Sequence, residues 1–133
     1  AILVGVLAAI IFQSSSVVSG IVLILAGAGH IDLMQSVGLI LGANIGTTST
    51  VIIASMALGR EAKRVALSHF LFNFLGVIIV LPFLGPFYQA VSWLDGGVVH
   101  QIANTYLIFN LTCTLLFLIA IKPFAFVVSK IIK

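Results

Sequence analysis

The chain has 133 residues, of which 62% are hydrophobic and 7% are charged, and its formal net charge at pH 7 is +3. Soluble domains carry about 25% charged residues, so this composition excludes a soluble domain and indicates an integral membrane protein. The basic residues lie at the edges of apolar segments, where Lys and Arg set membrane topology, so the positive charge does not indicate nucleic-acid binding.

Two further features of the sequence, its single cysteine and its first residues, limit what kind of chain this is. Cys113 is the single cysteine and lies in an apolar segment, so we expect neither an intrachain disulfide nor a thiol metal cluster. We interpret it as a small apolar packing residue. The sequence begins at Ala1 inside an apolar segment without a preceding basic region, which is not typical of a signal peptide. We therefore expect a fragment of a longer chain or a processed product.

Residues 1–27 form the first apolar unit, and four consecutive polar residues, 13–16 (the QSSS segment), interrupt it near its middle. Unpaired buried polar groups cost about 2–7 kcal/mol each, so this cluster indicates a site or a backbone break. One continuous helix would be about 40 Å long and could span the membrane. Two short helices would instead form a re-entrant hairpin whose tip is covered by protein or lines a cavity. We predict the hairpin, because a second unit breaks at a similar depth.

A short polar turn, residues 27–32, leads to the second unit, residues 33–58. Asp32 is predicted to cap the helix that starts at Leu33, and His30 is interpreted as a solvated loop residue. The GANIGTT segment (residues 42–48), followed by Ser49 and Thr50, interrupts this unit. Gly, Asn, Ser and Thr weaken helix interiors, so we predict an unwound transmembrane helix. Its C-terminal half would begin near Thr47 with free N–H groups and positive dipole charge.

The rest of the chain supplies two uninterrupted spans, residues 65–84 and 102–121. A charge cluster, residues 59–64, precedes the first span, and Lys122, Lys130 and Lys133 follow the second. The connection 85–101, with Trp93 and Asp95, contains no Lys or Arg. The positive-inside rule therefore places 59–64 and 122–133 in the cytoplasm of a multi-pass protein of the cell membrane, either plasma or inner membrane.

Two interrupted apolar segments in one membrane protein indicate a transport site. Helix N-termini at such breaks attract an anion, whereas free carbonyls and hydroxyl oxygens suit a small cation. The predicted spans contain no Lys, Arg, Asp or Glu, so a bound oxyanion would need a co-bound cation, which favours sodium coupling. A proton-driven carrier would have only His69 available. The alternative is that these hydroxyl clusters serve helix packing alone.

The two uninterrupted spans carry similar polar stripes. His69, Asn73 and Gly76 share one helical face of the first, and Tyr106, Asn110 and Thr114 share one face of the second. Hydrogen bonds between helices are the favoured interpretation, and His69 is interpreted as a packing histidine. A role in lining or supporting the site is the alternative.

These motifs also resemble those of a known family. The QSSS segment, the GANIGTT segment and the HFLFN run at residues 69–73 match, in order and spacing, one repeat of the type II sodium/phosphate cotransporters and their bacterial relatives. The resemblance implies sodium-coupled symport of inorganic phosphate by two inverted repeats, each with a re-entrant hairpin and an unwound helix. This chain has one QSSS element where the family has two. We therefore expect an all-α half of an inverted-repeat transporter, with its second homologous repeat in the same parent chain or in a second copy.

The motifs and the resemblance together give the expected site residues. Phosphate contacts are expected from Gln13, Ser14, Ser15, Ser16, Thr47 and Thr48. Sodium ligands are expected from Gln13, Ser16, Asn44, Thr47, Thr48, Ser49 and Thr50. A supporting role behind the site is expected for His69, Asn73 and Asn110. Neither enzymatic activity nor a cofactor other than sodium is expected. A structural or assembly segment of the membrane, or a sodium symporter of another oxyanion, stays open as an alternative.

Overall fold

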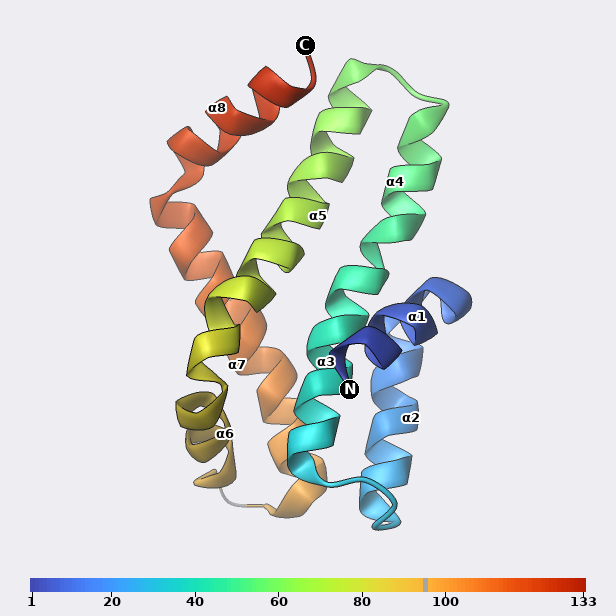
Figure 1. The fold of residues 1–133 in the computed structure, drawn as a ribbon, viewed down its shortest axis with the longest axis vertical. Coiled ribbons are helices and arrows are strands. Elements are labelled where there is room, and N and C mark those ends of the chain that lie inside the picture. Colours follow the sequence, from blue (N-terminus) through green and yellow to red (C-terminus); the bar gives the residue numbers. More distant parts are fainter. Residues whose placement is uncertain (95) are drawn as a thin grey trace.

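The structure, a computed structural model, describes residues 1–94 and 96–133; Asp95, expected in the outer connection, lies outside the described residues. The all-α class is confirmed (Figure 1). The helices in chain order are α1 Ile2–Phe12, α2 Ser15–Gly27, α3 Leu33–Gly46, α4 Thr48–Met56, α5 Arg60–Val80, the 3₁₀ turn η1 Leu81–Phe83, α6 Leu84–Ser92, α7 Gly97–Ile119 and α8 Ile121–Ile131. Within the described ranges, three helical stretches are long and apolar enough to cross a membrane: Leu33–Met56, Arg60–Ser92 and Gly97–Ile119.

The later helices are longer than the sequence predicts. The expected span 65–84 begins at Arg60, so the charge cluster forms the first turns of α5 rather than a loop. Arg, Glu, Ala and Lys are good helix formers, and residues 57–59 separate α4 from them. The expected span 102–121 begins at Gly97, and most of the expected connection is α6. Pro86 is tolerated there because it lies in the first turn of that helix.

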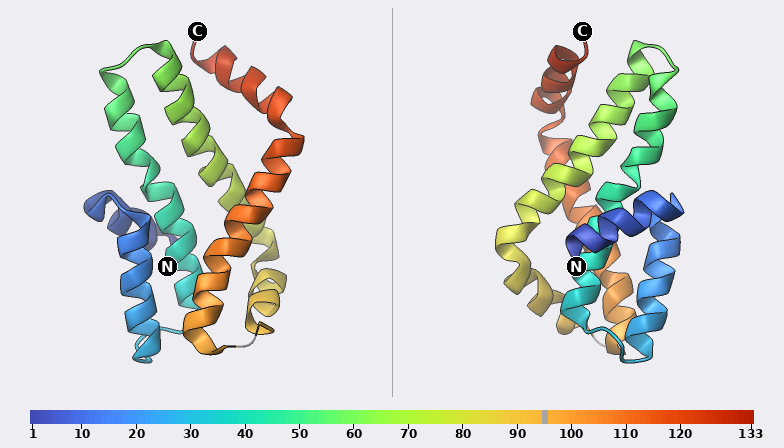
Figure 2. Two further views of the ribbon diagram at one scale, coloured as in Figure 1. Left: turned by 180° about the vertical axis from the view of Figure 1, so that it is seen from behind. Right: turned by 45° about the vertical axis from the view of Figure 1, so that its right-hand side comes forward.

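The helix bundle has two distinct ends (Figures 1 and 2). The turn between α4 and α5 lies at the same end as the C-terminus, and the turn between α2 and α3 lies at the opposite end with the start of α7. At that opposite end, Asp32 caps α3 as predicted, because its Oδ1 accepts from the Gln35 N–H at 2.7 Å. The two basic stretches thus share one end of the molecule, as the topology argument requires.

Helix α3 is the centre of the core. Its Val37, Ile40 and Leu41 are buried against Val22 of α2 and Phe109 of α7 within one hydrophobic cluster. Helix α1 crosses α3 and packs against it more extensively than against α2 (Figure 1). The first two helices therefore do not lie side by side along their length.

Glycine permits this crossing. A Cβ added at Gly42 would meet the carbonyl of Ile2, and one added at Gly46 would meet the carbonyl of Val6. The two backbones are therefore in direct contact, as in other membrane helix pairs with small residues at the interface. A similar close approach joins α5 to α7, where a Cβ at Gly76 would lie 2.6 Å from the Cys113 sulfur. Cys113 is free and buried, which confirms its interpretation as a packing residue.

Candidate functional site

The QSSS segment reverses the chain between α1 and α2. Gln13 ends α1 in the left-handed region, with φ 52° and ψ 28°, and is the one non-glycine residue of positive φ among the described residues. Ser14 is extended and its Oγ accepts from the Val17 N–H at 3.3 Å, so it is the N-cap of α2. Residues 1–27 thus form two helices, and whether the pair is re-entrant in a membrane stays a prediction.

This turn presents polar groups without a basic side chain. Gln13 and Ser16 are exposed, and Ser14 and Ser15 are half-buried. The first N–H groups of a helix have no partner within it and carry partial positive charge. The start of α2 can therefore donate several hydrogen bonds to an anion, together with the serine hydroxyls.

The second unit divides into α3 and α4 at Thr47, as predicted, but the GANIGTT segment is not unwound, which corrects that part of the prediction. The interruption between α3 and α4 is Thr47 alone, and its φ of −62° and ψ of −25° are helical. Its N–H and its hydroxyl both donate to the carbonyl of Ala43, at 3.0 and 2.8 Å. The Thr48 hydroxyl donates to the carbonyl of Ile45 at 2.7 Å. These local bonds satisfy the carbonyls of the preceding turn, so the backbone stays wound.

The same bonds limit what the two threonines can do chemically. Each hydroxyl has one proton, which is engaged with a backbone carbonyl, so only the oxygen lone pairs of Thr47 and Thr48 remain available. Lone pairs can coordinate a cation but cannot donate to phosphate. This hydrogen bonding leaves lone pairs that suit a cation, and both the sodium role and the phosphate role of these residues stay predictions.

Buried polar atoms without a partner mark the same region. Within the described residues, the Nδ2 of Asn44, the Oγ1 of Thr50 and the Oγ of Ser19 are buried and make no hydrogen bond. A buried polar group without a hydrogen bond typically destabilises the folded state by about 1–3 kcal/mol, so each of these atoms is a candidate contact for a ligand or a partner. Asn44 and Thr50 were predicted from the sequence, whereas Ser19 was missed. It lies one helical turn after Ser15, and this i, i+4 spacing could have revealed it.

Two small pockets adjoin the breaks. One, of about 120 Å³, lies between α1 and the α3–α4 junction, with Val6, Gly46, Thr48 and Ser49 in its lining. The other, of about 300 Å³, lies between α2 and α7 and is lined by Ser16, Ser19, Gly20, Leu23, Ala103 and Tyr106. The second pocket brings the QSSS segment close to α7, and the first brings Thr48 and Ser49 close to α1.

The two breaks lie at the same level of the molecule. Helix α2, of 13 residues, ends at the turn from which α3, of 14 residues, begins, so each break is about 20 Å from that turn. Figure 1 shows the tip of the α1–α2 pair level with the α3–α4 junction. Among the described residues, no hydrogen bond joins the QSSS segment to Thr47, Thr48, Ser49 or Thr50.

The expected supporting residues bond within their own helices. The Nδ2 of Asn73 donates to the carbonyl of His69 at 3.0 Å, and that of Asn110 donates to the carbonyl of Tyr106 at 2.8 Å. The two polar stripes are therefore alike because in each one an Asn side chain donates to the carbonyl four residues earlier in the same helix. Asn73 is buried and His69 is exposed in this chain, so the interpretation of His69 as a packing histidine stays a prediction. No hydrogen bond in the described part of the chain links these side chains to either break.

Comparison with known proteins gives a consistent result. The profile of the Na⁺/Pi-cotransporter family matches residues 1–130. The uncharacterized protein YqeW of Bacillus subtilis is 41% identical over 89% of this chain and 38% of its own length. The sodium-dependent phosphate transport protein 2B of Bos taurus is 36% identical over 98% of this chain and 19% of its own. The protein 2A of Ovis aries is 41% identical over 62% of this chain and 14% of its own. The chain thus spans well under half of each relative, and no solved structure matches it.

Proposed function

The chain belongs to the Na⁺/Pi-cotransporter family, and we propose that it forms one repeat of a sodium-coupled symporter of inorganic phosphate. In this proposal the chain is a transporter segment and not an enzyme. It lies in the plasma or inner membrane, with residues 59–64 and 122–133 in the cytoplasm. A second homologous repeat, in the same parent chain or in a second copy, completes the site.

Phosphate binds at the QSSS segment in this proposal. The N–H groups at the start of α2 and the hydroxyls of Ser15 and Ser16 donate to the phosphate oxygens. The Ser14 hydroxyl already accepts the Val17 N–H, so its own proton is free to donate as well. With no Lys or Arg between residues 1 and 59, the charge compensation must come from bound sodium.

Sodium binds at oxygen atoms of both breaks. The lone pairs of Thr47 and Thr48, whose protons are engaged, are the best prepared ligands. The side-chain oxygens of Asn44, Ser49 and Thr50 complete the set on α3 and α4. The Gln13 carbonyl oxygen and the Ser16 hydroxyl are shared between sodium and phosphate at the tip.

One observation carries the proposal more than any other. The two polar breaks lie at the same level of the molecule. Each is about 20 Å, the length of α2 or α3, from the turn that joins these two apolar helices. Helix packing alone needs single small or polar residues at contacts. It does not account for three buried polar atoms, on Ser19, Asn44 and Thr50, that bond to nothing in the described part of the chain.

The experiment is equilibrium binding of labelled phosphate to the purified chain, first in sodium and then in potassium. We expect binding in sodium only. Ser15→Ala should weaken it about tenfold, the effect of one lost hydrogen bond to a charged group, with unchanged helicity. Ser92→Ala is the matched control, because among the described residues its hydroxyl bonds only to the Gln89 carbonyl, close to the end that holds the α2–α3 turn.

Three results would contradict the proposal in different ways. Equal binding in potassium would exclude sodium coupling. Stronger competition by sulfate than by unlabelled phosphate would indicate a symporter of another oxyanion. Absence of binding in both salts, to this chain and also to a longer chain that contains its second repeat, would contradict the proposed site and favour a structural segment.

A further inference from the structure

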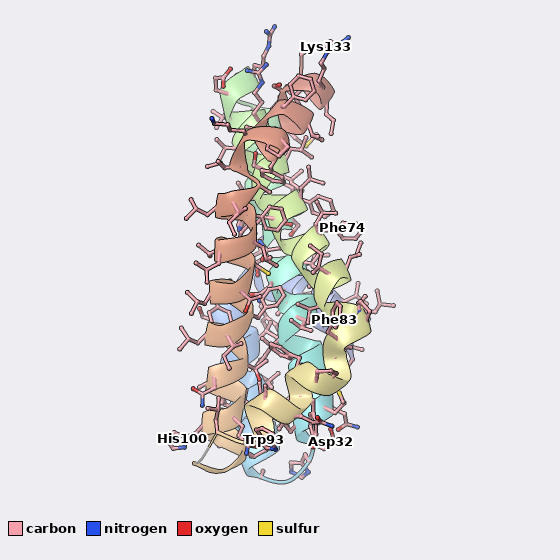
Figure 3. All side chains as sticks on the ribbon, turned by 90° about the vertical axis from the view of Figure 1, so that its left-hand side faces the viewer. Asp32, Phe74, Phe83, Trp93, His100 and Lys133 are labelled. Carbon is pink, nitrogen blue, oxygen red and sulfur yellow. The ribbon has the colours of Figure 1, made fainter. Side chains whose placement is uncertain are left out.

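The end of the molecule that holds the C-terminus concentrates its positive charge. All six basic residues of the chain lie in the first turns of α5 or in and after α8: Arg60, Lys63, Arg64, Lys122, Lys130 and Lys133. Glu61 is the one carboxylate side chain among them. Figure 3 places Lys133 at this end, and Asp32, Trp93 and His100 at the other. The fully exposed Trp93 is typical of the far membrane interface.

Helix α8 is the most amphipathic of the described helices, and it was not predicted from the sequence. Lys122 and Lys130 lie on one side of it with the exposed Phe126, whereas the exposed Ile121 and Ile131 lie on the other. It bends away from α7 at Ala120 and leans toward the start of α5 (Figure 1). A helix with a basic face and an apolar face is typical of the membrane interface.

Helices α5 and α8 enclose a notch of about 280 Å³. Its lining is Glu61, Arg64, Val65 and Ser68 from α5 with Ala125, Val128 and Ser129 from α8. Ser68, Ser129 and the guanidinium make one part polar, whereas Val65, Ala125 and Val128 make the rest apolar. This mixture of polar and apolar groups suits the glycerol-phosphate region of a lipid, where headgroup and acyl chains meet.

Arg64 is the basic group of this notch. Its Nε donates to the carbonyl of Ile132 at 3.0 Å and holds the end of α8 against α5. Its Nη1 bonds to Glu61 at 2.9 Å, but Glu61 is 79% exposed and Arg64 is 29% exposed. An exposed ion pair contributes little, about 0–1 kcal/mol, so a better anion can compete with Glu61. The guanidinium has five N–H donors, and these two bonds are the ones it makes within the described residues.

We propose that the notch between α5 and α8 binds the phosphate headgroup of an anionic phospholipid, held by Arg64. Basic pockets between membrane helices on the cytoplasmic side bind such headgroups. The site lies at the end of the molecule, distant along α5 from both breaks, so it does not rest on the proposed transport function. The acyl chains of the bound lipid lie along the exposed apolar side chains of α5 and α8, including Val65 and Val127.

The test is titration of the purified, detergent-solubilised chain with fluorescent short-chain phosphatidylglycerol and with phosphatidylcholine of the same chains. We expect phosphatidylglycerol to bind about tenfold more tightly, and Arg64→Gln to remove this preference. Lys133→Gln is the charge-matched control at the same end and should stay within about twofold of the unaltered chain. Glu61→Gln removes the competing carboxylate and should tighten binding.

Other results would overturn the proposal. Equal binding of the two lipids, or equal effects of Arg64→Gln and Lys133→Gln, would show general surface attraction in place of a site. Displacement by excess inorganic phosphate would show a pocket for a free anion. If Arg64→Gln loses helicity, Ser129→Phe fills the notch with Arg64 intact, and unchanged phosphatidylglycerol binding to that variant would equally refute the site.

Discussion

The QSSS segment and the GANIGTT segment are both polar breaks in apolar helices at one level of the molecule, but their polar groups are used differently. At the QSSS segment the chain reverses through a left-handed Gln13, and the polar side chains stay exposed or half-buried. At the GANIGTT segment the helix continues, and the hydroxyls of Thr47 and Thr48 bond to their own preceding turn. One break therefore presents donors, and the other presents oxygen lone pairs.

The difference comes from what each break packs against. The GANIGTT segment lies under α1, whose backbone contacts Gly42 and Gly46 directly, so the crossing helix holds this stretch in place. The tip of the α1–α2 pair has no such cover, since Ile11, Phe12 and Gln13 are all exposed. The contact with α1, together with the local bonds of Thr47 and Thr48, thus keeps this polar run helical.

Gly42→Val should have the largest effect, because it breaks the contact that distinguishes the two segments. The added side chain would clash with the backbone of Ile2 and Val6, and overpacking of this kind costs about 3 kcal/mol or more. We expect a large fall in the melting temperature of the purified chain and loss of sodium-dependent phosphate binding.

Gly20→Ala is the control for that variant. Nothing lies within 4 Å of a Cβ at Gly20, which is also helical, so alanine should stabilise α2 by about 0.5–1 kcal/mol. Similar falls in melting temperature for both variants would show that α1 does not pack on α3 through backbone contact.

Asn44→Leu should have the next largest effect and separates a ligand role from a packing role. Leucine has nearly the same shape and removes a buried amide whose Nδ2 has no partner among the described residues. Replacing an unsatisfied group by an apolar one is neutral or stabilising, by up to about 1 kcal/mol. We expect unfolding to shift upward slightly while sodium-dependent phosphate binding falls about tenfold. A clear loss of stability with unchanged binding would assign Asn44 to packing.

The sequence predicts the positions of the breaks well and their conformation less well. Four polar residues at 13–16 and the glycine-flanked Asn44 identify both interruptions, because polar and glycine residues stand out in apolar helices. The wound state of Thr47 could not be predicted, since it depends on α1 crossing α3 and on which carbonyl each hydroxyl bonds. Helix α8 was missed because Pro123 and Lys122 resemble the end of a span, although proline is tolerated in the first turn of a helix.

Ser14→Ala has a smaller expected effect and sharpens the contrast at the helix start. Ser14 Oγ caps α2 by accepting the Val17 N–H, whereas no side chain caps α4. Loss of a serine N-cap costs about 1 kcal/mol, which should lower the melting temperature by a few degrees. The matched variant Thr47→Val removes a hydroxyl from the residue that precedes α4. An equal fall in both variants would show that Thr47 is as important to its helix as a true cap.

Gln13→Gly has the smallest expected effect on stability, but the direction of the change in unfolding temperature is the most informative. A left-handed conformation costs a non-glycine residue such as Gln13 about 1–2 kcal/mol, so glycine should stabilise the folded state. Part of this gain is lost because glycine also gives the unfolded chain more conformational freedom. We therefore expect thermal unfolding to move upward by the equivalent of about 0.5 kcal/mol. If the Gln13 amide binds sodium or phosphate, binding falls in the same variant, and Gln13→Asn, which keeps an amide and tolerates this conformation, recovers part of it. Higher stability with unchanged binding would mean that the strain at Gln13 serves the turn alone, because strain at a ligand site is expected to be released only with a loss of function.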